Sequence, residues 1–132
     1  MTQRNIDVMD IIVSKMAEGA KLSEAMQFVY NKRSVAIPFR DEMFNVPFDV
    51  LNMSNRTVNA LMRAKARTIH DVIDMCSGDK FNKIRNFGRL SQIELLESIL
   101  DYCWSQMENN ERVNFLIDVV ERNQNYIREE IA

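Results

Sequence analysis

Apolar residues recur at intervals of three and four along most of the chain, which is the spacing of one face of an α-helix. Two such runs fill the first thirty residues, on either side of the break at Glu18-Gly19-Ala20-Lys21. The apolar stripe of the first predicted helix is Ile6, Met9, Ile12, Val13 and Met16. That of the second, which Ser23 or a neighbour would cap, is Leu22, Ala25, Met26 and Val29. We interpret the pair as a packed helical hairpin rather than a helix-turn-helix DNA reader.

Two prolines mark the boundary after this hairpin. Residues 34–39 predict an extended connector, because the residue before Pro38 avoids the helical region. Pro47 interrupts the sequence again, and we place the boundary near residue 45. Beyond it the pattern predicts several short helices and one longer one. Their expected core is Leu51, Val58, Leu61, Met62, Ile69, Val72, Ile73, Phe81, Ile84, Phe87, Ile93, Leu96, Ile99 and Leu100.

A last helix is predicted from about Ser105, because Ser105-Gln106-Met107-Glu108 has the spacing of a capping box. Its apolar positions would be Val113, Leu116, Ile117, Val120, Ile127 and Ile131. An amphipathic helix needs a surface to cover. We favour the preceding domain as that surface, and a homodimer through the terminal helices is the alternative.

Composition supports an all-α fold class. The 132 residues suit one compact domain with helical extensions, and 3 Gly and 2 Pro are too few for the tight turns of a β-sandwich. We expect segments 1–45, 46–104 and 105–132: an N-terminal helical pair, a compact bundle of short helices, and a C-terminal amphipathic helix. No apolar run approaches the roughly 18 residues of a membrane span, and the N-terminus lacks a signal peptide's apolar segment. The expected location is therefore cytoplasmic, with no membrane partner.

The residues that usually carry catalysis or metal binding are sparse. His70 is the only histidine, and we expect it in the exposed first turn of a helix that Thr68 and Asp71 cap. Neither Cys76 nor Cys103 belongs to a CxxC pair, and the three glycines are too far apart for a phosphate-binding loop. We therefore expect no catalytic residues, no metal and no cofactor, and hence not an enzyme.

The charge distribution favours an anion partner in the middle third. Residues 51–100 carry 8 Lys and Arg against 5 Asp and Glu, although the whole sequence has a net charge of −2. In this third, a short helix is expected to end near Asn86, Gly88 permits a tight backbone, and a longer helix starts beside it. The amides of that helix start, together with Arg85 and Arg89, would form a phosphate seat. An ordinary helix–loop–helix corner is the alternative.

Three motifs then resemble one family in the same order and at the same spacing. They are Leu51-Asn52-Met53-Ser54-Asn55-Arg56-Thr57-Val58-Asn59-Ala60-Leu61, Thr68-Ile69-His70-Asp71-Val72 and Lys83-Ile84-Arg85-Asn86-Phe87-Gly88-Arg89-Leu90-Ser91-Gln92-Ile93-Glu94. Over residues 46–104 they resemble the C-terminal domain of the bacterial RNA polymerase alpha subunit. The resemblance implies a compact helical fold with helix-hairpin-helix elements, which binds A/T-rich DNA in the minor groove.

The resemblance also implies which residues meet DNA. Arg56 corresponds to the family's groove-inserting arginine and Asn59 to its neighbouring asparagine. Contacts from the hairpin and the second helix correspond to Gly88, Ser91 and Glu94. We expect Glu94 to orient a basic neighbour or a partner, because a carboxylate repels phosphate.

Two positions depart from the family pattern. Leu90 stands where the family has a lysine, which removes a phosphate contact, while Arg89 keeps a positive charge next to it. Ala60 stands at a small contact position after the asparagine. A weaker DNA affinity or a shifted footprint would follow.

The sequence thus predicts a non-enzymatic DNA-binding protein, a transcription regulator whose partners are double-stranded DNA and RNA polymerase or a transcription factor. We expect a stand-alone relative that lacks the amino-terminal domain of the alpha subunit, with unrelated helical segments on either side of residues 46–104. The alternative is a protein–protein interaction module of the same fold, which docks RNA polymerase or a transcription factor without binding DNA.

Overall fold

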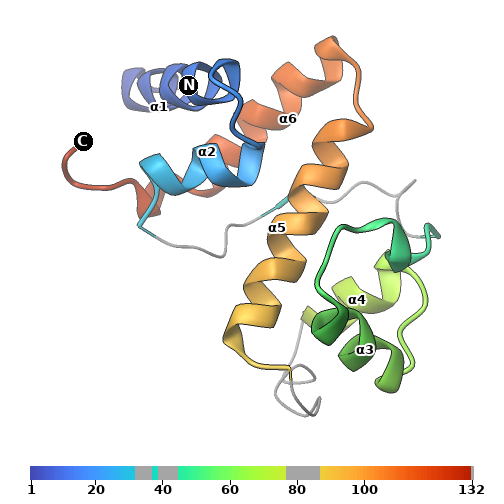
Figure 1. Ribbon diagram of the computed structural model, residues 1–132. Helices are drawn as coiled ribbons and strands as arrows, with labels where there is room; N and C mark the ends of the chain where they lie inside the picture. The colour runs from blue at the N-terminus through green and yellow to red at the C-terminus, as the bar shows by residue number, and fades with distance from the viewer. Residues whose placement is uncertain (32–36, 39–44, 77–86, 132) are drawn as a thin grey trace. The chain divides into compact units, whose positions relative to one another are not determined.

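A computed structural model of the protein describes residues 1–31, 37–38, 45–76 and 87–131 (Figure 1). The helices in this part of the sequence are α1 (Gln3–Ala17), α2 (Leu22–Val29), α3 (Asn55–Arg63), α4 (Ile69–Cys76), α5 (Arg89–Ser105) and α6 (Asn109–Arg122), with 3-10 turns η2 (Phe48–Val50) and η4 (Gln124–Tyr126). The described residues contain no strand, so the all-α prediction is confirmed. Of the helices described, none is both long and apolar enough to cross a membrane.

The protein packs as two compact units. Unit 1 comprises Met1–Pro38 and Leu100–Ala132, and unit 2 comprises Phe39–Ile99. Helix α5 therefore contributes its first part to unit 2 and its last part to unit 1. The division into 1–45, 46–104 and 105–132 was expected from the sequence pattern rather than from packing, and it stays a prediction.

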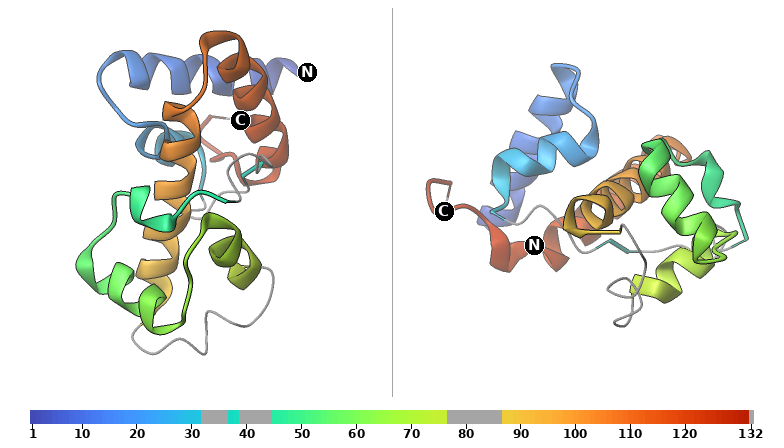
Figure 2. Two further views of the ribbon diagram at one scale, coloured as in Figure 1. Left: turned by 90° about the vertical axis from the view of Figure 1, so that its right-hand side faces the viewer. Right: turned by 60° about the horizontal axis from the view of Figure 1, so that its bottom comes forward.

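Unit 1 is built around α1, α2 and α6. Helix α1 packs against both of the others, which Figure 2 shows from two directions. The N-terminal helical pair thus supplies a surface for the C-terminal amphipathic helix. The buried apolar side chains of this unit are Val8, Ile12, Leu22, Ala25, Met26, Val29, Tyr30, Ile37, Leu100, Cys103, Met107, Phe115, Leu116, Val119, Val120 and Ile127.

A glycine in the left-handed region ends α1. Gly19 has a φ of 109°, which an L side chain rarely adopts. Its N–H donates to the Met16 carbonyl at 3.0 Å, and the next amide, that of Ala20, donates back to Lys15 at 3.1 Å. This is the Schellman arrangement that closes a helix and starts a turn.

A carboxylate from α5 holds the start of α2. The Ser23 amide donates to Asp101 Oδ1 at 2.9 Å, and the Ser23 hydroxyl donates to Asp101 Oδ2 at 2.6 Å. The N-cap position itself is Lys21, whose N–H donates to Glu24 Oε1 at 3.2 Å. Ser23, one of the caps that the sequence suggested, instead lies buried in the first turn.

The segment after η4 fixes the end of α2. Tyr30 and Ile127 form an isolated antiparallel bridge, and the Arg128 amide donates to the Val29 carbonyl at 2.9 Å. The Arg128 guanidinium also donates to the Gln27 carbonyl at 3.3 and 3.1 Å. A cation at the C-terminal end of a helix interacts favourably with its dipole.

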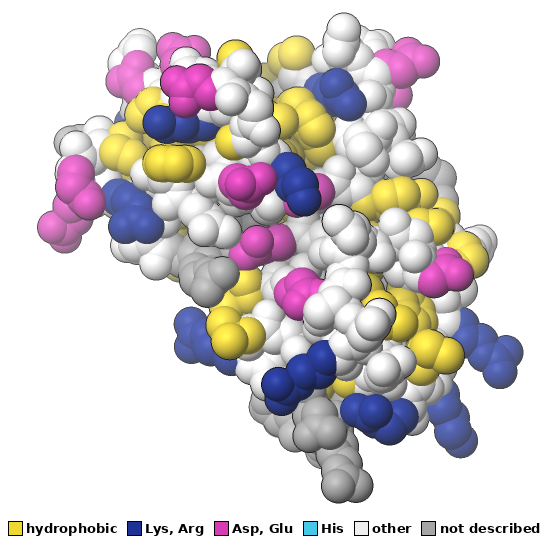
Figure 3. All heavy atoms as spheres, viewed as in Figure 1, with side chains coloured by type: hydrophobic (Ala, Val, Ile, Leu, Met, Phe, Trp, Pro, Cys, Tyr) yellow, Lys and Arg dark blue, Asp and Glu magenta, His cyan; other side chains and the backbone are white. Residues whose placement is uncertain are grey.

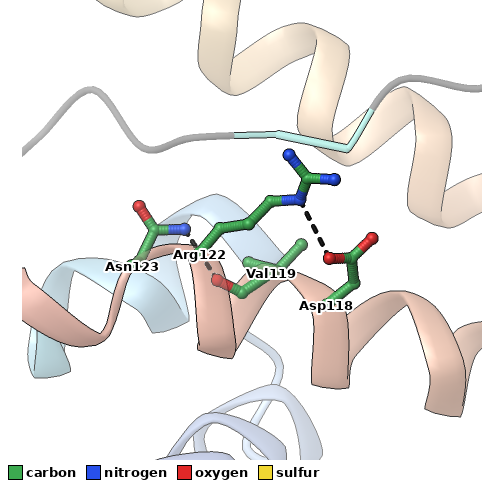
Figure 4. A network of polar contacts seen from close by, with 4 residues as sticks. All are labelled: Asp118, Val119, Arg122 and Asn123. Carbon is green, nitrogen blue, oxygen red and sulfur yellow. Dashed lines mark hydrogen bonds and ion pairs between the residues drawn. The ribbon is translucent and has the colours of Figure 1, made fainter.

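Helix α6 ends in a short polar network (Figure 4). Arg122 Nε donates to Asp118 Oδ1 at 2.9 Å, one turn earlier on the exposed side of the helix. The fully buried Asn123 donates its side-chain amide to the Val119 carbonyl at 2.8 Å. The Val119 carbonyl also accepts from the Asn123 backbone amide at 3.2 Å, so the backbone and the side chain of Asn123 both bond to it at the end of the helix.

Unit 2 contains α3, α4 and the first part of α5. Its buried apolar side chains are Phe48, Leu51, Ala60, Leu61, Ala66, Ile69, Val72, Phe87, Ile93, Leu95 and Ile99. An isolated bridge between Pro47 and Thr68 ties the segment before η2 to the start of α4. The Phe48 amide donates to the Arg67 carbonyl at 3.0 Å there.

The capping box before α4 is present as predicted. The Asp71 amide donates to Thr68 Oγ1 at 3.2 Å, and the Thr68 amide donates to Asp71 Oδ2 at 3.1 Å. Asp71 Oδ2 also accepts from the Arg67 amide at 2.9 Å. These backbone donors hold the pKa of Asp71 below its ordinary value. His70 is exposed in this first turn, as expected.

Several positions expected in apolar faces are exposed. Met62 of α3 is 62% exposed, and Ile6, Val13 and Val113 are also exposed. Of the expected stripe of α1, Ile12 is buried and Met9 and Met16 are half-buried, whereas Ile6 and Val13 are exposed; the buried face also includes Asn5 and Val8. The polar Asn5 on this face has a hydrogen-bond partner, because its side-chain amide donates to Gln124 Oε1 at 3.4 Å.

The expected start of the last helix was also wrong. Helix α5 continues to Ser105, whose hydroxyl donates to the Tyr102 carbonyl at 2.7 Å and so belongs to a helix end. Helix α6 begins four residues later, with the Glu108 amide donating to Glu111 Oε1 at 3.4 Å. The spacing that Ser105 and Glu108 share is therefore repeated by Glu108 and Glu111, three residues further along.

Some expectations lie outside the described residues. They concern Phe81 and Ile84, the short helix expected to end near Asn86, and most of the connector at 34–39.

Candidate nucleic-acid interface

Helix α3 presents two of the expected DNA-binding residues to solvent. Its N-cap is Ser54, whose Oγ accepts from the Thr57 amide at 3.4 Å. Thr57 is fully buried and fixes the inner side of the first turn. Arg56 and Asn59, three residues apart and therefore neighbours on one helix face, are both exposed.

Helix α5 holds the segment that leads into α3. The Glu94 carboxylate accepts from the Ser54 amide and, at 3.2 Å, from the Ser54 hydroxyl. One turn further along α5, the Ser98 hydroxyl donates to the Asn52 carbonyl at 3.1 Å. The beginning of α3 is thereby joined to the first turns of α5.

The start of α5 is the second part of the interface. Gly88 and Arg89 are exposed, and the Gln92 amide makes the first bond along the helix, to the Gly88 carbonyl at 3.1 Å. The helix therefore offers no acceptor for the amides of residues 89–91, and its dipole places a partial positive charge there. Ser91 is only 9% exposed, so its hydroxyl has little access to a ligand. Arg85 lies outside the described residues.

Nothing in the fold of the described residues requires glycine at position 88. Its φ is outside the left-handed region, and a Cβ built there would meet no heavy atom within 4 Å. The expectation that Gly88 permits a tight backbone therefore does not explain why a glycine stands here. Among the described residues, none lies against the position that a side chain at residue 88 would take.

Exposed basic side chains of unit 2 lie at the starts of α3 and α5 and also at and after the end of α3. Figure 3 shows Lys and Arg side chains around the end of the unit that holds α3 and the beginning of α5. The exposed basic residues described in this unit are Arg56, Arg63, Lys65, Arg67 and Arg89. Within the described residues, no group of three or more His, Cys, Asp and Glu could hold a metal ion.

The sequence did not single out Ser54 or Ser98. Ser54 carries the local signal of an N-cap, because it stands three residues before Thr57, whose amide it accepts. Its bond to Glu94 spans 40 residues, and no local spacing predicts a contact over that separation.

The sequence is similar to one family of known proteins. Residues 39–101 match the model of the family described as the C-terminal domain of the bacterial RNA polymerase alpha chain. The DNA-directed RNA polymerase subunit alpha of Thermosynechococcus vestitus is 31% identical over 71 residues, which cover 54% of this protein and 22% of the relative. That of Mesomycoplasma hyopneumoniae is 41% identical over 59 residues, covering 45% of this protein and 18% of the relative. No solved structure matches.

A third relative reaches into the flanking segments. The DNA-directed RNA polymerase subunit alpha of Dehalococcoides mccartyi is 28% identical over 118 residues, covering 83% of this protein and 36% of the relative. An alignment of that extent continues beyond residues 46–104. The expectation that the flanking segments are unrelated to the alpha subunit stays a prediction. In all three comparisons the matched segment spans little more than a third, or less, of the length of the relative.

Proposed function

We propose that this protein is a non-enzymatic DNA-binding protein that regulates transcription, because residues 39–101 match the model of the family described as the C-terminal domain of the bacterial RNA polymerase alpha chain. It contacts the minor groove of A/T-rich DNA and the adjacent phosphates. One observation carries the proposal: an exposed Arg56 stands on a helix start that Ser54 and Glu94 join to the first turns of α5.

Arg56 enters the groove in this proposal. The minor groove of A/T-rich DNA is narrow and has an enhanced negative potential, which attracts an arginine side chain. Asn59, on the same exposed face of α3, supplies an amide that donates to and accepts from the groove edge or the backbone. Since every A·T pair shows similar acceptors there, the preference is for A/T content rather than for one sequence.

The start of α5 holds the phosphate backbone. The amides of residues 89–91 and the positive end of the helix dipole attract an anion, and the Arg89 guanidinium adds charge beside them. Gly88 itself carries no side chain that would hinder the approach of a phosphate. Such contacts orient a protein on the duplex without reading bases.

An exposed apolar residue favours a second candidate function. Leu90 is 72% exposed in the first turn of α5, at the position where the family pattern has a lysine. A leucine gains nothing from phosphate but can be buried by a protein. The alternative is therefore a module that docks RNA polymerase or a transcription factor through this corner without binding DNA.

The Arg56→Ala variant tests the first proposal. We expect its affinity for an A/T-rich duplex, measured by fluorescence anisotropy at low salt, to fall about tenfold or more, because the groove contact is lost. Arg4→Ala is the matched control, since it removes the same charge from an exposed position of α1 in unit 1. Equal affinities of the two variants would overturn the groove assignment. If the unaltered protein binds no duplex but is retained by purified RNA polymerase, the second candidate replaces the first.

A further inference from the structure

We propose that Glu94 is a positioning residue, whose carboxylate fixes the first turn of α3 through Ser54 and so aims Arg56 without touching DNA. The inference rests on the proposed function, and it assigns Glu94 a task different from the DNA contact that the family resemblance implies.

The contacts of Ser54 carry the argument. Its amide donates to the Glu94 carboxylate, and its hydroxyl lies 3.2 Å from both Glu94 Oε2 and Thr57 Oγ1, which are alternative acceptors for its single proton. When the hydroxyl proton points at the carboxylate, a lone pair of Oγ is free to accept from the Thr57 amide, 3.4 Å away. Glu94 thus orients the cap that starts the helix, and bonds to a charged acceptor are stronger than neutral ones.

Because Thr57 is buried, the cap also restricts the direction in which Arg56 points. Thr57 is 0% exposed, which sets the inner side of the first turn against the core of the unit. Successive residues of a helix point about 100° apart, so the preceding position faces outward. The direction of Arg56 therefore depends on how the first turn is seated.

A second hydrogen bond from α5 also fixes the position of the first turn of α3, which we call the seat of this helix. Ser98, one turn after Glu94 on α5, donates its hydroxyl to the Asn52 carbonyl at 3.1 Å. Two consecutive turns of α5 are thus hydrogen-bonded to residues 52 and 54, immediately before α3 begins. A carboxylate at this place also interacts favourably with the positive end of the α3 dipole.

The chemistry of Glu94 argues against a direct contact with DNA. A carboxylate that faced a phosphate would repel it, whereas both oxygens of Glu94 accept from donors of Ser54. If Glu94 merely lay near the duplex, removing its charge would strengthen binding.

A double-mutant cycle tests the inference. We expect Glu94→Ala to weaken binding to an A/T-rich duplex about fivefold to tenfold in the native background and less than about twofold in an Arg56→Ala background. Glu94→Gln keeps an oxygen that accepts from the Ser54 amide, so it should retain most of the affinity that Glu94→Ala loses. Asp49→Asn is the charge-matched control, because Asp49 is an exposed carboxylate of the same unit.

The opposite results are equally clear. Binding that strengthens in Glu94→Ala, as it should in Asp49→Asn, would show that the carboxylate acts only by its charge. An equal loss in both backgrounds would show that Glu94 acts independently of Arg56. Either result overturns the positioning role.

Hydrogen exchange separates this inference from the proposed function. We expect the amides of Ser54 and Thr57 to exchange faster in Glu94→Ala than in the native protein, since both depend on the seat. If the native protein binds no duplex, the DNA-binding proposal fails while the exchange still tests the seat. Unchanged exchange at both amides overturns the inference, whatever the DNA titration shows.

Discussion

The two units begin a helix with the same chemistry but expose different surfaces at that point. In unit 1 the Asp101 carboxylate accepts from the amide and the hydroxyl of Ser23, and in unit 2 the Glu94 carboxylate accepts from the same two groups of Ser54. Both carboxylates belong to α5. Ser23 is buried, whereas Ser54 is exposed and is followed two residues later by an exposed arginine.

The comparison separates a structural use of this contact from a functional one. A carboxylate that satisfies a buried serine contributes mainly to stability, because its loss leaves buried donors without an acceptor. A carboxylate that seats an exposed helix start contributes less to stability, but it determines where the next side chains point. Three sets of variants sharpen this distinction.

Asp101→Ala should have the largest effect on stability. We expect the free energy of unfolding to fall by about 2 to 3 kcal/mol, because two charge-assisted bonds to a buried serine are lost. The Glu94→Ala change should cost about 1 kcal/mol, since water replaces the carboxylate at the exposed Ser54. Urea unfolding of both variants measures the difference. A larger loss in Glu94→Ala than in Asp101→Ala would contradict the distinction between the units.

Two glycines offer the next comparison. Gly19→Ala should lower the free energy of unfolding by about 1 kcal/mol, because alanine is strained at a φ of 109°. Gly88→Ala should change it by less than about 0.5 kcal/mol, because its Cβ meets open space. The same Gly88→Ala change should still weaken DNA binding severalfold, since the methyl group stands where a phosphate would approach. Duplex affinity unchanged by Gly88→Ala would remove this corner from the interface.

Asp71 in unit 2 provides the smallest effect. Its pKa is lowered in the folded protein, so the stability it contributes is present above the unfolded pKa of about 3.9 and is lost as the pH falls through the lower folded value. Asp71→Asn should therefore be destabilised by less than about 1 kcal/mol at pH 7, because the group is largely exposed to solvent. The difference from the native protein should shrink below pH 4 in thermal unfolding. A difference that stays constant down to pH 2 would contradict the assigned cause.

Local spacing predicted the features that depend on neighbouring residues. The all-α class, the Thr68 and Asp71 capping box and the exposure of His70 all follow from contacts within four residues. The expected start of the last helix also rested on local spacing, and the structure uses a second box of the same spacing three residues further along. The buried face of α1, in contrast, involves a partner far along the sequence. The buried Asn5 donates to Gln124, and no helical pattern reveals a bond over 119 residues.

The candidate site likewise has residues that the sequence indicated and a contact between two helices that it did not. The family motifs indicated Arg56, Asn59, Gly88, Arg89, Ser91 and Glu94, and their roles stay predictions. Reasoning from sequence did not find the link between Ser54 and Glu94, because it depends on how two helices pack. That link is the feature which joins the start of α3 to the first turns of α5.

The central claim is that Arg56 reads a narrow A/T-rich minor groove. The most direct test is a pair of titrations, one with an A/T-rich and one with a G/C-rich duplex of equal length, on the native protein and on Arg56→Ala at the same low salt concentration. The account predicts that the native protein prefers the A/T-rich duplex and that Arg56→Ala loses this preference while it keeps weak, salt-sensitive binding to both. An A/T preference that survives unchanged in Arg56→Ala would contradict it.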